Sequence, residues 1–302
     1  MLRPLLIPLT YFCLQTWLGI PQAKCQVKLN IMEDAFDDQY LGCAEEMDKE
    51  AAKLIQSEMS SFSPIWKNAA EKWNSVKTKI SRPRGFKDEY GIAIVAYTDC
   101  MPYNSKTFPT EFNAAVREAG TSRAHYMDSF HFKAFHYYLT RALQLLRGKC
   151  DVMYKMTVYR GVSKKYEYQK YCDIRFGYFA SSSINRTQAE TFGTATFLTI
   201  HTCFGVNIQD MSYNPKQKEV LIPVHEIFRV VTNQGNNYTL QSKKQACSHF
   251  NCTYLGGEKN EVCVGNSATR GSPAFPSELS PSLFGGSIIL VHVIALKLFA
   301  SF

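Results

Sequence analysis

The sequence lacks the signatures of several common chemistries. None of its ten cysteines forms a CxxC pair, which disfavours zinc binding and thiol redox chemistry. No GxSxG motif and no Ser-His-Asp spacing is present, which disfavours a nucleophilic serine. The basic residues give a formal net charge of +8 but form no regular stripe with aromatic side chains. We therefore expect no metal, no serine hydrolase activity and no nucleic-acid partner.

Internal repeats are also missing, and the two ends differ from the rest of the 302-residue chain. Residues 1–23 begin with Arg3, continue through an apolar run and end in small residues. This order is typical of a secretory signal peptide, and a buried N-terminal helix is the alternative. Between the two ends, residues 24–265 are long enough for a single domain with its own core.

The C-terminal segment 266–302 places small residues before a Pro/Ser-rich spacer and an apolar tail that begins at Leu283. That order is typical of a glycolipid-anchor signal, which is removed from the mature protein. Because no basic stop-transfer cluster follows the tail, we favour the anchor over a single transmembrane helix.

Two features inside the chain favour an extracellular location. Three N-x-[ST] sequons occur, at Asn185, Asn237 and Asn251. The ten cysteines are numerous enough for a disulfide framework. Cys13 lies in the expected signal peptide, so nine cysteines remain and at least one has no internal partner.

The pattern of elements changes near Cys150. Before it, residues 42–80, 109–119 and 122–147 read as helices, and the short apolar run 90–98 reads as a strand. After it, one short helix at 187–192 interrupts strands at 154–162, 173–183, 194–204, 206–213, 218–223 and 226–233. Helices followed by strands predict an α+β fold with a mainly antiparallel core.

Three polar features accompany those strands. Arg160 ends a strand that is otherwise apolar, and its planar guanidinium matches phosphate or carboxylate oxygens. In "FASSS", alternation directs Ser181 and Ser183 to one side of the strand. Alternation also places Gln217 and Glu219 on one face of the next strand. Taken singly, these features are more simply interpreted as a structural arginine paired with a local acid, a strand end that leads into a turn, and a surface ion pair.

Their order along the chain resembles the arginine–serine–glutamate class of mono-ADP-ribosyltransferases. The similarity is greatest to the vertebrate glycolipid-anchored ecto-enzymes, including T-cell members with a Gln-x-Glu motif. It rests on "FDDQYLGC", "SFHFKAFHYYLTRALQLLR", "VYRGV", "RFGYFASSS", "EVLIP" and "NCTY" in that order. The resemblance implies the ADP-ribosyltransferase fold, with an N-terminal helical region and a two-sheet core. It also implies extracellular NAD as co-substrate, surface or secreted protein acceptors, and attachment to the membrane through the glycolipid.

The resemblance also implies roles for individual residues. Arg160 would bind the NAD phosphates, Ser181 would position the catalytic carboxylate, and Glu219 would be that carboxylate. Gly161 would hold the nicotinamide carboxamide through its backbone. The other implied NAD-site residues are Tyr97, Ser212 and Tyr178, the last of which departs from the glutamine common in the family.

Family members that modify arginine carry Glu-x-Glu, whereas this chain has Gln217 before Glu219. A carboxylate pairs bidentately with a guanidinium, and an amide does so poorly. The glutamine therefore favours NAD glycohydrolysis or non-arginine acceptors, while the family favours arginine. Tyr213 in the preceding loop would face the acceptor. The alternative from another class is a catalytically silent surface antigen or adhesion protein on the same fold.

The family pattern further implies the disulfides Cys43–Cys252 and Cys150–Cys203, with Cys172 as a competitor in the second pair. It assigns no partner to Cys100, Cys247 and Cys263.

Overall fold

The computed structural model describes residues 27–28, 31–103, 106–168 and 170–267. The expected signal peptide and anchor signal lie outside these residues, apart from the first residues of the anchor segment. Seven α-helices occur in the described part of the chain: α1 (Ala44–Val76), α2 (Asp88–Tyr97), α3 (Phe108–Ala119), α4 (Arg123–Ser129), α5 (Lys133–Leu146), α6 (Cys150–Lys155) and α7 (Arg186–Glu190). The chain also contains four short 3₁₀ turns in the described residues: η1 (Lys77–Lys79), η2 (Gln209–Met211), η3 (Pro215–Gln217) and η4 (Thr253–Leu255).

The main sheet has the order β6 (Asp173–Ile174), β11 (Glu226–Gln234), β12 (Asn237–Ser248), β8 (Thr196–His201), β4 (Thr157–Val162), β7 (Ala180–Ser183), β10 (Glu219–Ile222) and β9 (Val206–Asn207), and β13 (Val264–Ser267) pairs with β12. Only β12 and β8 run parallel within this sheet. Two small sheets pair β1 (Val27–Lys28) with β5 (Tyr166–Glu167), and β2 (Pro102–Tyr103) with β3 (Lys106–Thr107).

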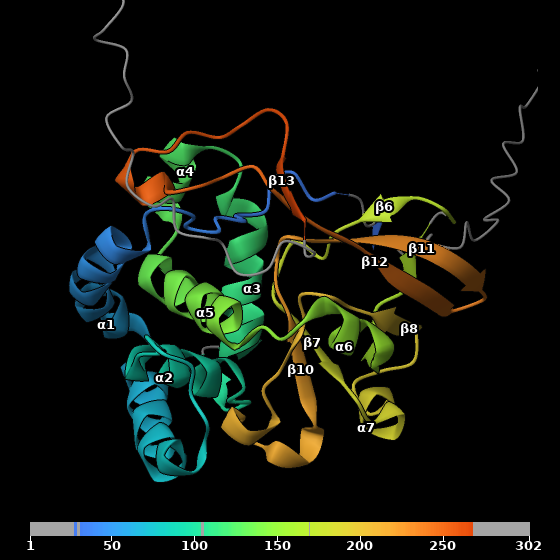
Figure 1. Ribbon diagram of the computed structural model, residues 1–302, viewed down its shortest axis with the longest axis horizontal. Coiled ribbons are helices and arrows are strands. Elements are labelled where there is room, and N and C mark those ends of the chain that lie inside the picture. Colours follow the sequence, from blue (N-terminus) through green and yellow to red (C-terminus); the bar gives the residue numbers. More distant parts are fainter. Residues whose placement is uncertain (1–26, 29–30, 104–105, 169, 268–302) are drawn as a thin grey trace, which may run out of the picture.

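This architecture confirms the predicted α+β class. The expected two-sheet core is hydrogen-bonded as one mixed, mostly antiparallel sheet. Its two halves join where β4 meets β7 through a single registered pair, Tyr159 and Ser183. Figure 1 shows α1, α2 and α5 grouped on one side of the molecule and the strands on the other, with β7 and β10 between them.

The run 90–98 is helical, so its prediction as a strand is wrong. Seven of the ten residues of α2 are buried, and the run therefore has no polar face that would reveal a helical period. Asp88 and Glu89 lie in the first turn, where a carboxylate favours the helix N-terminus. Trp73 of α1 packs on Gly91 so closely that a Cβ there would lie 2.4 Å from the indole ring. Tertiary packing therefore selects the helix.

The predicted helix 122–147 is two helices, α4 and α5. Phe130 is extended (ψ 103°), and the carboxylate of Glu58 accepts hydrogen bonds from the backbone N–H groups of Ala134 (2.9 Å) and Phe135 (3.3 Å). These bonds cap the N-terminus of α5, because the first N–H groups of a helix have no partner within it. A side chain 76 residues away in the sequence thus begins the second helix.

Several strand boundaries also differ from expectation. The run 173–183 forms two separate strands, β6 and β7, and 206–213 forms only the two-residue β9 followed by η2. The longest strand, β12, was not predicted. It carries many polar residues, and its buried positions become apparent only from its pairing with β11 and β8.

Three disulfides cross-link the described residues. The two that the resemblance implies are present, Cys43–Cys252 and Cys150–Cys203, and a third joins Cys247 to Cys263. Within the described part of the chain, Cys100 and Cys172 are unpaired.

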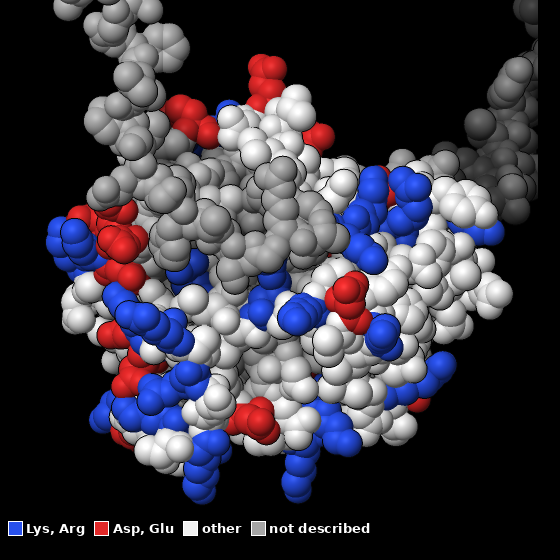
Figure 2. Space-filling model, viewed as in Figure 1, with Lys and Arg blue, Asp and Glu red and all other residues white. Residues whose placement is uncertain are grey.

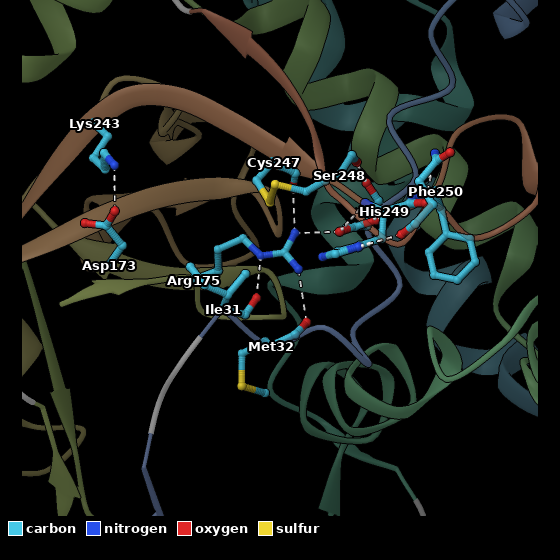
Figure 3. The surroundings of a disulfide bond; sticks show 12 residues. Ile31, Met32, Asp173, Arg175, Lys243, Cys247, Ser248, His249 and Phe250 are labelled. Carbon is cyan, nitrogen blue, oxygen red and sulfur yellow. Dashed lines mark hydrogen bonds and ion pairs between the residues drawn. A yellow bond between two sulfur atoms is a disulfide. The ribbon is translucent and has the colours of Figure 1, made fainter.

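The surroundings of the third disulfide hold the N-terminal segment against the sheet (Figure 3). The fully buried Arg175 donates to the backbone oxygens of Ile31 (2.6 Å) and Met32 (3.0 Å) and forms an ion pair with Asp37 (2.5 Å). It also donates to the carbonyl of Cys247 (2.5 Å). A buried guanidinium is tolerated only when its donors find such acceptors.

Charges on the surface are mixed. On the face drawn in Figure 2, basic and acidic side chains are interspersed over the helical half, and Lys and Arg side chains gather over β6, β11 and β12. Some of them are paired there: Asp173 forms ion pairs with Arg229 (2.9 Å) and Lys243 (2.5 Å). No helix in the described ranges has the length and apolar character to cross a bilayer.

Candidate active site

A cavity of about 380 Å³ lies where α3, β4, β7, α7 and the start of β10 meet. Arg160, Ser181 and Glu219, from three neighbouring strands, all line it. Gly161, Tyr178 and Gln217 line it too. The sheet and the segments that lead into β7 and β10 thus bring together six residues that span 60 positions of the sequence.

Arg160 projects from β4 towards β7. Its Nη1 donates to the backbone oxygen of Ser181, and its Nη2 lies 3.5 Å from the hydroxyl of Tyr178. Its Nε is buried and has no hydrogen-bond partner among the residues that the structure describes. Because an unpaired buried donor is costly, this N–H is available to an acceptor on a ligand.

Glu219 is the first residue of β10 and only 5% of its surface is exposed. Burial raises the pKa of its carboxyl to about 7, against the opposing effects of a hydrogen bond from Ser181 and the positive charge of Arg160. A carboxylate with this pKa changes charge near neutral pH, as catalytic acids and bases in partly dry sites commonly do.

Gln217 and Glu219 reach the cavity differently from the expectation of a shared strand face. Gln217 ends η3, and Lys218 then adopts the left-handed conformation (φ 48°) before β10 begins. Lys218 is exposed, and the two flanking residues line the cavity. The hydroxyl of Ser183 donates to the backbone oxygen of Gln217 (2.7 Å) and so fixes this turn to β7.

Gly161 lies against the end of α7. An added Cβ would come within 2.2 Å of the backbone oxygen of Gly193 and 2.3 Å of that of Ala189. Glycine at this position is thus required by the close approach of α7 to β4, whatever the ligand contributes.

The remaining sequence candidates lie around the cavity rather than in its lining. Tyr97 is buried at the end of α2, and its hydroxyl donates to the carbonyl of Phe179 (2.5 Å). Burial raises the pKa of Tyr97 to about 12. Ser212 is buried, while Tyr213 is 39% exposed and its backbone N–H donates to the Thr98 hydroxyl (2.8 Å).

Sequence reasoning missed the wall that α3 contributes. Thr110, Asn113 and Arg117 line the cavity from one face of this helix, at spacings of three and four. Asn113 donates to the Tyr97 hydroxyl (2.9 Å) and the Phe179 carbonyl (3.1 Å). Its buried Oδ1 has no partner in the described part of the chain. The signal available in the sequence was the polar face of this amphipathic helix, on which these three residues lie.

Cys100 was also missed. Desolvation, together with the charges of Glu219 and Asp99, raises the pKa of the thiol of this free cysteine, and its interaction with the side chain of Gln217 opposes that rise. Across the described residues no group of three or more His, Cys, Asp or Glu side chains is arranged to hold a metal ion.

The site and the fold match one family. The family model of NAD:arginine ADP-ribosyltransferases matches residues 29–248, which is most of the chain. The chain is 44% identical over 281 residues to the ecto-ADP-ribosyltransferase 5 of Mus musculus, covering 89% of each chain. It is 38% identical over 265 residues to the T-cell ecto-ADP-ribosyltransferase 1 of Rattus norvegicus, covering 85% of this chain and 90% of the other.

Solved structures agree. A mutant of the mono-ADP-ribosyltransferase ART2.2 in complex with NAD superimposes with a TM-score of 0.66 at 38% identity, covering 76% of this chain and 99% of that one. The chain belongs to the NAD:arginine ADP-ribosyltransferase family. It is an NAD-dependent mono-ADP-ribosyltransferase, and NAD is its substrate.

Proposed function

We propose that the cavity is the NAD site and that Arg160, Ser181 and Glu219 carry the reaction, in which nicotinamide leaves and the ADP-ribosyl group passes to a protein side chain or to water. The observation that carries this proposal is the buried carboxylate of Glu219, which lines the same cavity as the guanidinium of Arg160 and the hydroxyl of Ser181.

Glu219 acts on the charge that develops during bond cleavage. Breaking the nicotinamide–ribose bond builds positive, oxocarbenium-like charge at the anomeric carbon. A carboxylate already fixed in a largely water-free site stabilises that charge more in the transition state than in the ground state. Nicotinamide leaves as a neutral molecule, so no general acid is needed. One carboxylate therefore suffices for cleavage.

Arg160 and Ser181 support this step. The unpartnered Nε of Arg160 and its fork suit the NAD phosphates. The Ser181 hydroxyl donates to Glu219 and favours its ionised form. Gly161 presents backbone at the cavity for the nicotinamide carboxamide. Tyr97 and Ser212 do not line the cavity, so they contribute to the NAD site from behind the residues that do.

Gln217 decides what receives the ADP-ribose. It lines the cavity beside Glu219, where a neutral amide cannot draw a proton from an arginine acceptor as a carboxylate would. Water and non-arginine side chains are therefore acceptors beside arginine, and Tyr213 is exposed on the preceding loop to contact a protein acceptor.

The protein works outside the cell. The relatives are named ecto-enzymes, and the three disulfides suit an oxidising compartment. We place a signal peptide at 1–23, one catalytic domain at 24–265 and a glycolipid-anchor signal at 266–302. Extracellular NAD and surface or secreted proteins are then the substrates.

The test uses the full-length chain expressed in animal cells and NAD labelled in the nicotinamide or the adenylate. Wild type should release nicotinamide, and Glu219→Gln should lower release by about a hundredfold or more, because it removes the charge that stabilises the transition state. Absence of release from wild type would refute the enzyme and favour the silent surface antigen, and release that survives Glu219→Gln would refute the site.

Acceptor choice is tested with Gln217→Glu. The ratio of labelled ADP-ribose on arginine to free ADP-ribose should rise in this variant. An unchanged ratio would show that position 217 does not select the acceptor.

A further inference from the structure

Tyr178 lies between two guanidinium groups at the cavity. The centre of its ring is 4.0 Å from Cζ of Arg117 and 5.6 Å from Cζ of Arg160. Only 3% of Tyr178 is exposed, and all three residues line the cavity. Arg117 comes from α3, Arg160 from β4, and Tyr178 from the segment that leads into β7. The ring thus bridges the helical wall and the strand wall.

The two arginines have no acidic partner in the described residues, where neither guanidinium lies within 4 Å of a carboxylate oxygen. Two like charges in one small cavity repel each other. The electron-rich face of an aromatic ring offsets part of that repulsion through cation–π attraction, which is worth about 0.5–2 kcal/mol for each contact. An unpaired double positive charge that lines a cavity suits an anion with two charges.

The phenol hydroxyl responds to the same charges. Burial by itself would raise the pKa of Tyr178, but the charges of Arg160 and Arg117 outweigh it, and the pKa is lowered. The other titratable groups that face the ring are Tyr166 on β5 and Tyr168 just after it. The acid Glu219 also lines the cavity and interacts with the charge of Arg160, but the charges that act on the ring of Tyr178 are those of the two arginines, so the field at the ring is positive.

We propose that Tyr178 is a positioning residue that holds Arg117 beside Arg160, so that the two guanidiniums together bind the diphosphate of NAD. This inference rests on the proposed NAD site and adds Arg117 and Tyr178 to it. The diphosphate bridge carries two negative charges, and a planar fork accepts phosphate oxygens bidentately. An aliphatic side chain at 178 would leave Arg117 without its stacking surface.

The experiment measures ADP binding by calorimetry, and KM and kcat for NAD, on protein purified after expression of the full chain. Tyr178→Leu, which removes the ring, should weaken ADP binding and raise KM by about tenfold, the equivalent of one lost charge-assisted contact. The kcat at saturating NAD should stay within about twofold. Tyr178→Phe keeps the stacking face and should restore ADP affinity to within about threefold of wild type. Arg117→Lys should behave like Tyr178→Leu.

The matched control is Tyr90→Leu, a tyrosine that is 2% exposed on α2 and does not line the cavity. It should lose stability as Tyr178→Leu does, but keep ADP affinity. The pH profile supplies a readout that a structural role would not move. As the phenol of wild type ionises at alkaline pH it repels the diphosphate, so KM should rise, and this rise should be absent in Tyr178→Phe.

Unchanged ADP affinity in Tyr178→Leu, or equal losses in Tyr90→Leu and Tyr178→Leu, would overturn the inference even if wild type cleaves NAD. Conversely, a wild type that binds ADP with the expected pattern of variants but releases no nicotinamide would support the two-guanidinium site and refute the proposed reaction.

Discussion

Replacing the buried carboxyl of Glu219 by an amide should make the protein more stable at alkaline pH. In the folded chain the pKa of Glu219 is about 7, against 4.5 for an unperturbed glutamate. The folded state therefore binds the proton more tightly than the unfolded state, and stability falls as the pH rises from about 4.5 through about 7. Above pH 7 the ionised carboxylate costs about 3 kcal/mol, at 1.36 kcal/mol for each pH unit between the two values.

Glu219→Gln has no charge to bury and avoids this cost. Its free energy of unfolding at pH 8 should exceed that of wild type by up to about 3 kcal/mol, and the difference should shrink towards pH 5, where both side chains are neutral in the fold. Urea unfolding at several pH values measures it, with the exposed Glu118→Gln as control. The reasoning would be refuted if the variant showed no gain in free energy of unfolding at pH 8, or the same gain at pH 5 and pH 8. Either result would mean that ionised Glu219 does not destabilise the fold.

Three further outcomes are expected. Ser181→Ala removes a hydrogen bond that lowers the pKa of Glu219, so the midpoint of the pH profile of nicotinamide release should move above 7. An unchanged midpoint would contradict the contact between Ser181 and Glu219. Gly161→Ala should lower the free energy of unfolding by about 1–3 kcal/mol, because its Cβ would meet two backbone oxygens within 2.3 Å; thermal unfolding will show whether the backbone adjusts instead. Asn251→Ala should cost about 1–2 kcal/mol, because the amide exchanges two hydrogen bonds with the backbone of Leu41 (2.8 and 2.9 Å), and no loss in urea unfolding would exclude that role.

The strand half of the site was predictable because its signals are local. Arg160 stands out as a charged residue in an apolar run, Glu219 as the acid that begins one, and period-two alternation places Ser181 on one side of β7. None of these signals was decisive alone, and the family resemblance joined them into one site. The three strands are neighbours in one sheet, so residues recognised separately meet in space.

The helical half was harder to predict because its causes are distant in sequence. α2 is apolar on nearly every side and packs through Gly91 on Trp73, so no period distinguishes it from a strand. The start of α5 depends on Glu58, and a capping partner 76 residues away leaves no local trace. The residues of α3 that line the cavity were hard to predict for the same reason. Arg117 is one of many arginines in the sequence, and its significance comes from the ring of Tyr178, which folding places against it.

The position of Gln217 bears on how its variants can be interpreted. Its backbone holds it from both sides, since its N–H donates to the carbonyl of Asn214 (3.1 Å) and its carbonyl accepts from Ser183 (2.7 Å). Gln217→Glu therefore changes the chemistry at the cavity without moving the turn. The new carboxylate, however, adds a like charge beside Glu219 and raises its pKa above 7. At neutral pH the variant would lose cleavage for lack of ionised Glu219, which would hide any gain in arginine transfer. The ratio of the two products at pH 8 or above, rather than the total rate at pH 7, is consequently the quantity that reports on the acceptor.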